Sequence, residues 1–219
     1  MTTQTQSWRM YEEERADIHD FLASLEPEQW DEPSLCEGWR VRDVAVHLLV
    51  DGPIEEIGVP RALVKAATFK FSVHRINAWW VEHNHDRPTD SVVAAFGGPW
   101  RPGWVSRRIG PAIGMRATVI HHQDMRRPLG MAREIPEERL RAALDVILSP
   151  RGSTNLGSFE RSKGVGLRAT DLDWSWGEGL EVSGPAESIL MALAGRPSAL
   201  SDLSGAGVAK LAGRVEVLH

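Results

Sequence analysis

Apolar side chains in the first two thirds of this chain recur at the spacing of α-helices, and proline and glycine interrupt the pattern. Between residues 7 and 25 they repeatedly fall on one helix face: Trp8, Tyr11, Ile18, Phe21, Leu22 and Leu25. Similar patterns cover residues 41–57, 61–85 and 113–127, and Gly52-Pro53 could kink or end the first of these. Because each of these segments can present an apolar stripe, we expect the four helices to pack as a bundle around a shared core.

The pattern changes after Pro150. Residues 151–164 are rich in glycine and serine, and two strand-like pieces follow, Val165–Thr170 and Leu180–Ser183. Short helical segments then cover residues 185–194 and 206–211. Long helices followed by a small mixed segment indicate two substructures in series. The sequence therefore predicts a mainly α fold, with a helical-bundle domain over residues 1–150 and a small α+β domain over residues 151–219.

Composition restricts the compartment and the partners. The formal net charge is −5, so the chain lacks the basic excess of nucleic-acid-binding proteins. No apolar run approaches the roughly 20 residues of a membrane-spanning helix, and the N-terminus has no apolar signal-peptide region. Cys36 is the single cysteine, which rules out an internal disulfide and suits a reducing compartment. We therefore expect a cytoplasmic protein with no nucleic-acid or membrane partner.

His47 and Asp51 form the first candidate site. If residues 41–57 are one helix, His47 lies on its apolar stripe and Asp51, four residues on, lies on nearly the same face. A single histidine on such a face is more often a core residue. The added carboxylate favours a different interpretation, since imidazole and carboxylate together suit zinc or another first-row divalent metal.

His121 and Asp124 form the second candidate site, in the sequence HHQD. His121 and His122 point in directions about 100° apart on a helix and cannot share one centre. His121 and Asp124, three residues apart, can share a face, so Asp124 could ligate a metal or orient His121 as a hydrogen-bond partner. The alternative is a solvated polar helix end.

Arg196 and Cys36 are single residues whose chemistry could serve a site. Arg196, in the sequence LAGRP, could clamp a substrate carboxylate, or could be an exposed arginine at a helix end. Cys36 could act as a nucleophile only beside a base that lowers its pKa. Nothing in the sequence supplies that base.

Three sequence strings resemble a known family. SLCEGWRVRDVAVHLL, residues 34–49, looks like the signature of the mycothiol-dependent maleylpyruvate isomerase family, a branch of the DinB-like metal-binding four-helix bundles. VIHHQDMRRPLG, residues 119–130, resembles that family's second signature. The stretch from Arg168 through the LSGAG sequence resembles its sterol-carrier-protein-like C-terminal domain. The resemblance covers nearly the whole chain and implies a DinB-like bundle followed by a small α+β domain.

The resemblance also implies a metal site. Bundles of this family hold a divalent metal, usually zinc, through one residue on the second helix and two on the fourth. The two histidines of that pattern fall on His47 and His121, and the remaining ligand position falls on Ala117, which cannot ligate. Two alternatives follow: Asp51 or Asp124 replaces the missing ligand, or the site has lost its metal. The shared helix face predicted above slightly favours Asp51.

If the resemblance extends to activity, the chain uses mycothiol, a low-molecular-weight thiol, as cosubstrate. The thiolate would attack a small electrophilic substrate, giving isomerisation if the adduct rotates and expels the thiol and thiol transfer if it does not. Arg196 would orient an acidic substrate. Two alternatives stay open: a metal-free small-molecule binding or regulatory module, and a metal-dependent hydrolase or lyase that uses no thiol. The sequence leaves the oligomeric state open, although an exposed apolar helix face could support a homodimer.

Overall fold

The computed structural model describes residues 3–153 and 156–215, and the chain divides into two compact units. The first, here called the helical unit, comprises residues 3–114 and 121–132. The second, the C-terminal unit, includes residues 115–120 and the chain from residue 133 onward. Both units are mainly helical, and the C-terminal unit also contains a small sheet. The predicted fold class is confirmed. The predicted functional boundary after residue 150 stays a prediction.

Within the described residues, seven helices and one 3-10 turn span the helical unit, although the middle of α7 belongs to the C-terminal unit. Their bounds are α1 (Gln4–Ala23), η1 (Pro27–Asp31), α2 (Val41–His47), α3 (Gly52–Thr68), α4 (Val73–His83), α5 (Thr89–Phe96), α6 (Trp104–Ile109) and α7 (Pro111–Arg126).

Local capping explains where the two helices next to the site begin. Thr3 and Gln6 form a capping box that starts α1, in which each side chain bonds the other residue's backbone N–H. At the start of α2, the Asp43 carboxylate accepts hydrogen bonds from the backbone N–H and the guanidinium of Arg40, at 2.9 and 3.0 Å. A carboxylate in the first turn also complements the positive end of the helix dipole.

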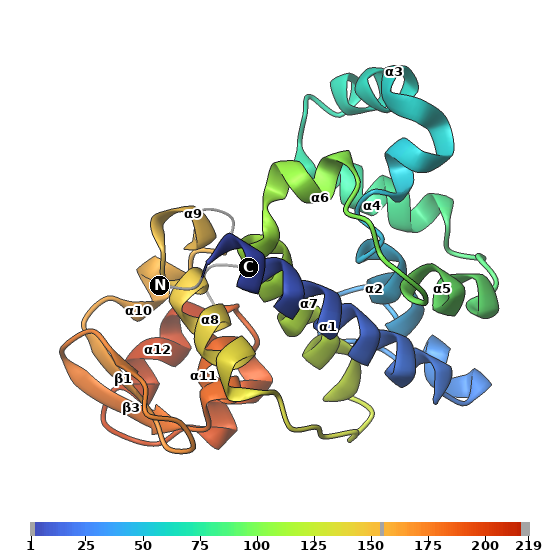
Figure 1. Cartoon of the computed structure of the whole chain (residues 1–219). Coiled ribbons are helices and arrows are strands. Elements are labelled where there is room, and N and C mark those ends of the chain that lie inside the picture. The colour runs from blue at the N-terminus through green and yellow to red at the C-terminus, as the bar shows by residue number, and fades with distance from the viewer. Residues whose placement is uncertain (1–2, 154–155, 216–219) are drawn as a thin grey trace. The chain divides into compact units, whose positions relative to one another are not determined.

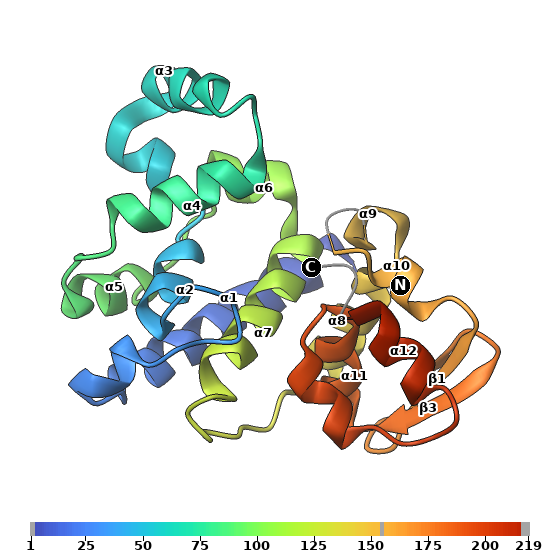
Figure 2. The same cartoon turned by 180° about the vertical axis from the view of Figure 1, so that it is seen from behind.

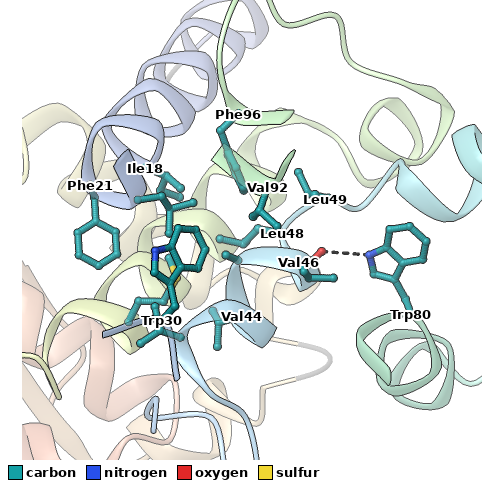
Figure 3. Close-up of a cluster of buried hydrophobic side chains, with 14 residues drawn as sticks. Ile18, Phe21, Trp30, Val44, Val46, Leu48, Leu49, Trp80, Val92 and Phe96 are labelled. Carbon is teal, nitrogen blue, oxygen red and sulfur yellow. Dashed lines mark hydrogen bonds between the residues drawn. The ribbon is translucent and has the colours of Figure 1, made fainter. Parts of the chain in front are cut away.

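A buried apolar cluster holds the helical unit together (Figure 3). Phe21 and Ile18 of α1 pack with Val44 of α2, and Trp80 of α4 donates its indole N–H to the Val46 carbonyl at 3.0 Å. Cys36 lies partly buried against this cluster. Burial of a large apolar side chain stabilises a fold by about 1.5–3 kcal/mol, so the cluster fixes the position of α2 and of the loop before it.

A buried polar network joins α1 to the C-terminal half of α7, and the two helices run side by side (Figure 1). Arg126 donates from Nε to Nε2 of His122 at 2.7 Å, so His122 is neutral and donates from Nδ1 to Glu14 Oε1 at 2.9 Å. The side chains of Glu14 and His122 are fully buried. The guanidinium of Arg126 also stacks 4.3 Å from the centre of the Phe21 ring.

The helix expected over residues 41–57 is divided in two, near the Gly52-Pro53 pair that could kink or end it. α2 ends at His47, the chain turns at Leu49–Asp51, and α3 begins at Gly52. Pro53 fits this break, because inside a continuous helix it would lack an N–H to donate and its ring would clash with the carbonyl four residues earlier, whereas it fits the first turn of a new helix.

The expected single helix over residues 61–85 is wrong. α3 ends at Thr68 and α4 starts at Val73, and Lys70 and Phe71 between them have positive φ values of 53° and 56°. Ser72 then caps α4 by accepting the Arg75 N–H. No residue of α3 is buried, and it exposes Val59, Leu63 and Val64. The homodimer stays a prediction.

The C-terminal unit packs helices on a three-stranded sheet (Figure 2). β1 (Val165–Ala169) lies between β2 (Ser175–Trp176), antiparallel to it, and β3 (Leu180–Gly184), parallel to it. α11 (Ala186–Leu193) contacts β1, β3 and α8 (Glu137–Ile147). The remaining elements are α9 (Pro150–Ser153), α10 (Ser158–Ser162), η2 (Pro197–Asp202) and α12 (Val208–Val215).

Within the described part of the chain, no helix combines the length and the apolar character that crossing a bilayer would require.

Candidate functional site

The loop before α2 closes a tight turn around Cys36. Ser34 Oγ accepts the Cys36 backbone N–H at 3.1 Å and donates to the Trp39 carbonyl at 2.8 Å. The Trp39 N–H bonds the Cys36 carbonyl at 3.0 Å. Gly38 adopts φ 75°, a left-handed conformation that glycine takes without strain. The residues around Cys36 thus fix the direction of its thiol.

This turn is attached to α7. The Leu35 N–H donates to the Asp124 backbone carbonyl at 3.0 Å. As a result, Cys36 Sγ lies 3.2 Å from Asp124 Oδ2 and 3.6 Å from His121 Nδ1. Three side chains with metal-binding and proton-transfer chemistry therefore converge from two segments far apart in the sequence.

His121 and Asp124 lie on the same face of α7, as their spacing predicts. His121 Nδ1 is 2.8 Å from Asp124 Oδ2, and the Asp124 side chain is fully buried, whereas that of His121 is 18% exposed. His122 points elsewhere, into the network with Glu14. A buried carboxylate that accepts a ring N–H holds an imidazole in one orientation, which leaves its other ring nitrogen available.

His47, the last residue of α2, brings a second imidazole to this cluster. Its ring centre lies 4.9 Å from that of His121, edge to face, and 5.1 Å from the Trp39 ring. Among the described residues, Nδ1 of His47 is buried and has no hydrogen-bond partner. Burial, reinforced by the charge of His121 and opposed by Asp124, lowers the pKa of His47 to about 3. His47 is therefore neutral near pH 7, the form in which imidazole binds metals.

Comparison with known families gives one match to this region. Residues 11–53 match the family model of the mycothiol maleylpyruvate isomerase N-terminal domain. The family resemblance predicted from the sequence is thereby confirmed.

The matched segment contains Cys36 and His47, while His121 and Asp124 lie beyond it. A solved structure, that of a mutant of the mycothiol-dependent maleylpyruvate isomerase, is similar to this chain at 17% identity and a TM-score of 0.48. The similarity covers 94% of this chain and 93% of that one. No match was found among curated proteins.

Asp51 does not share a helix face with His47, because α2 ends before it. Its carboxylate instead accepts backbone N–H groups of Gly103, Val105 and Ser106, at 3.0, 2.8 and 3.1 Å, and the Ser106 hydroxyl. Asp51 therefore caps the start of α6. It also borders a polar cavity of about 170 Å³, together with Arg15 and Arg87.

Arg196 lies in the C-terminal unit, just before η2, and donates to the Ala194 carbonyl at 2.7 Å. Its charge contributes to the lowered pKa values of Arg116, to about 10, and of Arg161; in both, burial is the larger cause. The role of Arg196 as a substrate clamp stays a prediction.

Sequence reasoning missed Cys36 as a member of the cluster. Its neighbours in the fold, His121 and Asp124, are 85 and 88 residues away, so no local pattern reveals them. A weak signal was present, since Cys36 and His47 stand in one family-like string and His121 and Asp124 in another.

Proposed function

We propose that the chain is a mycothiol-dependent isomerase or thiol transferase that acts on a small electrophilic organic substrate at a divalent-metal site. The observation that carries this proposal is the convergence of His47, His121, Asp124 and Cys36, two of which lie in the segment that matches the family. A cluster of metal-binding and titratable groups with perturbed pKa is typical of a functional site.

The residues present fit a divalent metal. Nδ1 of His47 is buried and, within the described residues, unpartnered, and the neighbouring donors are imidazole, carboxylate and thiol, which suit zinc. His47 and His121 would hold the ion, while Asp124 would either ligate it or orient His121. When bound, such an ion favours the thiolate form of a nearby thiol by lowering its pKa.

The protein's own residues position this chemistry. Asp124 fixes the ring of His121, and Trp39 packs against His47 and limits access of water to it. The mycothiol sulfur then adds to an electrophilic carbon, forming a C–S bond while the electron pair moves into the substrate. If Asp124 orients His121 and does not ligate the ion, its Oδ2, near both His121 and Cys36, would accept the proton that the mycothiol thiol loses.

Arg196 would bind a carboxylate of an acidic substrate through its planar guanidinium. We expect Arg196→Ala to raise the KM for a carboxylate-bearing substrate by about tenfold or more while zinc content stays unchanged, since a charge-assisted hydrogen bond contributes about 1.5–3 kcal/mol. Arg196→Lys tests whether the guanidinium fork is needed. An unchanged KM in both variants would remove Arg196 from the site.

The metal is tested first, by elemental analysis of untagged protein, wild type and His47→Ala. We expect about one equivalent of a divalent ion in the wild type, as for a single site, and its loss in the variant. The purified protein is then assayed on maleylpyruvate and on other small electrophiles, with and without mycothiol. Turnover that requires mycothiol supports the proposal, and turnover of equal rate without mycothiol contradicts it.

Ala117 favours a second candidate, a metal-free small-molecule binding or regulatory module. In this case the wild type would bind no zinc after incubation with the ion, and ligand binding would be the same with and without chelator. The elemental analysis therefore separates the two candidates before any substrate is known.

A further inference from the structure

We propose that Cys36 supplies a metal ligand in this chain, so that Cys36, His121 and Asp124 form a thiolate–imidazole–carboxylate site. This inference deepens the proposed function and rests on its metal site. It assigns to Cys36 the ligand that Ala117 cannot provide.

The distances support this ligand set. Cys36 Sγ lies 3.6 Å from His121 Nδ1 and 3.2 Å from Asp124 Oδ2, and His121 Nδ1 lies 2.8 Å from Asp124 Oδ2. Ordinary zinc bond lengths in a tetrahedral site place sulfur, nitrogen and oxygen ligands roughly 3.3–3.6 Å apart. The S–N distance already fits, and the other two need small outward movements. The protons on Cys36 Sγ and on His121 Nδ1 must leave as the ion binds, so that sulfur, Nδ1 and Oδ2 all face the ion.

The fold holds the Cys36 thiol in this position. The turn from Ser34 to Trp39 is closed by its own hydrogen bonds, and the Leu35 N–H attaches it to the Asp124 carbonyl. Cys36 also packs against the buried cluster of the helical unit. A ligand fixed in advance loses little conformational entropy when a metal binds.

His47 adds an independent observation beside these three residues. Its ring meets that of His121 at 88°, and Nδ1 is buried without a hydrogen-bond partner in the described residues. Leaving a buried polar atom unpaired costs about 1–3 kcal/mol, and coordination of an ion would remove this cost. His47 stands outside the three residues whose ligand atoms lie within 4.8 Å of one another, and its ring borders that set through His121.

A thiolate ligand makes a prediction about the metal. Soft thiolate favours zinc and similar ions, whereas magnesium and manganese prefer oxygen ligands. We therefore expect zinc and cobalt to bind this chain in preference to manganese.

Cobalt(II) spectroscopy tests the inference directly, because Cys36 is the single cysteine of the sequence. Untagged full-length protein is titrated with cobalt(II) in a buffer that contains no thiol. A thiolate-to-cobalt charge-transfer band in the near ultraviolet can then arise only from Cys36. We expect this band in the wild type and its disappearance on addition of zinc, which displaces cobalt.

Two substitutions complete the test. Cys36→Ser should abolish the charge-transfer band and weaken zinc binding by about tenfold or more, since even the loss of a residue that only supports a ligand has such an effect. Glu37→Gln changes the exposed neighbour of Cys36 and should leave the band intact. Far-ultraviolet circular dichroism checks that both variants fold.

The outcomes separate this inference from the proposed function. Cobalt bound without the charge-transfer band, and lost in His47→Ala, would overturn the role of Cys36 and leave the metal site standing. The band together with no mycothiol-dependent turnover would overturn the proposed function and leave the ligand set standing. No cobalt bound by the wild type would overturn the inference and the metal-dependent form of the proposed function.

Discussion

At the scale of single residues, burial decides the chemistry of His47. An imidazole in water has a pKa near 6.5, but burial in the helical unit lowers the pKa of His47 to about 3. Its neighbour His121 keeps 18% of its side chain exposed and is held by Asp124. Two histidines whose ring centres lie 4.9 Å apart therefore differ in burial, because His47 packs against Trp39 and is enclosed, whereas His121 lies at the edge of the cluster.

This burial predicts a dependence of stability on pH in chelator-treated, metal-free protein. Between pH 6.5 and about 3, the unfolded chain binds a proton at His47 that the folded protein does not bind. The free energy of unfolding should therefore decrease as the pH falls through this window. Urea unfolding of wild type and His47→Gln at pH 7 and pH 5 measures the effect. The variant should lose less stability than the wild type, and equal losses would contradict the lowered pKa of His47.

At the scale of elements, the site depends on how α7 is held against α1. Glu14, His122 and Arg126 form a buried chain of hydrogen bonds on the face of α7 that does not carry His121. Such a network fixes the rotation of a helix about its own axis, because a small rotation would separate buried polar groups from their partners. The direction of His121 and Asp124 toward Cys36 follows from this.

His122→Ala tests that role. Removing the imidazole leaves the fully buried Glu14 carboxylate without this partner, so we expect a loss of about 3 kcal/mol in the free energy of unfolding. Urea unfolding followed by tryptophan fluorescence measures it. His121→Ala, one residue away and partly exposed, is the matched control and should cost clearly less. Similar losses in both variants would contradict the structural role of His122.

A second element-scale prediction concerns Asp51 and α6. Asp51→Ala removes the acceptor of three backbone N–H groups at the start of α6, so these amides should exchange with solvent faster. Zinc affinity should stay the same, since the Asp51 carboxylate is engaged at α6. Hydrogen exchange and zinc titration give the two readouts. A large loss of zinc affinity would return Asp51 to the ligand set.

At the scale of the whole molecule, the chain is two compact units, and the candidate cluster lies in one of them. Cys36, His47, His121 and Asp124 all belong to the helical unit, whereas α8 packs on α11 within the C-terminal unit. Each unit has its own buried apolar residues. We therefore expect damage to the core of the C-terminal unit to leave the metal site intact while that unit remains folded.

Leu144→Ala makes this test. Leu144 of α8 is fully buried, and its truncation should reduce the stability of the C-terminal unit by about 2–5 kcal/mol. The cobalt spectrum, recorded well below the unfolding temperature, should match that of the wild type. The matched truncation of a core side chain in the helical unit, Phe21→Ala, should change the cobalt spectrum. An altered spectrum in Leu144→Ala would mean that the units are coupled.

The sequence by itself determined the mainly α class and the strand pieces near residues 165 and 180, and it marked His47, His121 and Asp124 as candidate site residues. Each of these is encoded locally, by apolar periodicity or by spacing on one helix. It also contained signals for the helix breaks: Gly52-Pro53 begins α3, and Ser72 caps α4. The left-handed residues Lys70 and Phe71 had no comparable signal.

Only the tertiary structure decided which polar residues meet. It brought Cys36 to His121 and Asp124 across more than eighty residues, and it committed Asp51 to α6. Local sequence cannot specify such contacts, because they depend on how separate helices pack, and packing is set by the burial of apolar side chains from many segments together. His47, His121 and Asp124 could be named as candidate ligands from the chain, but their grouping with Cys36 required the fold.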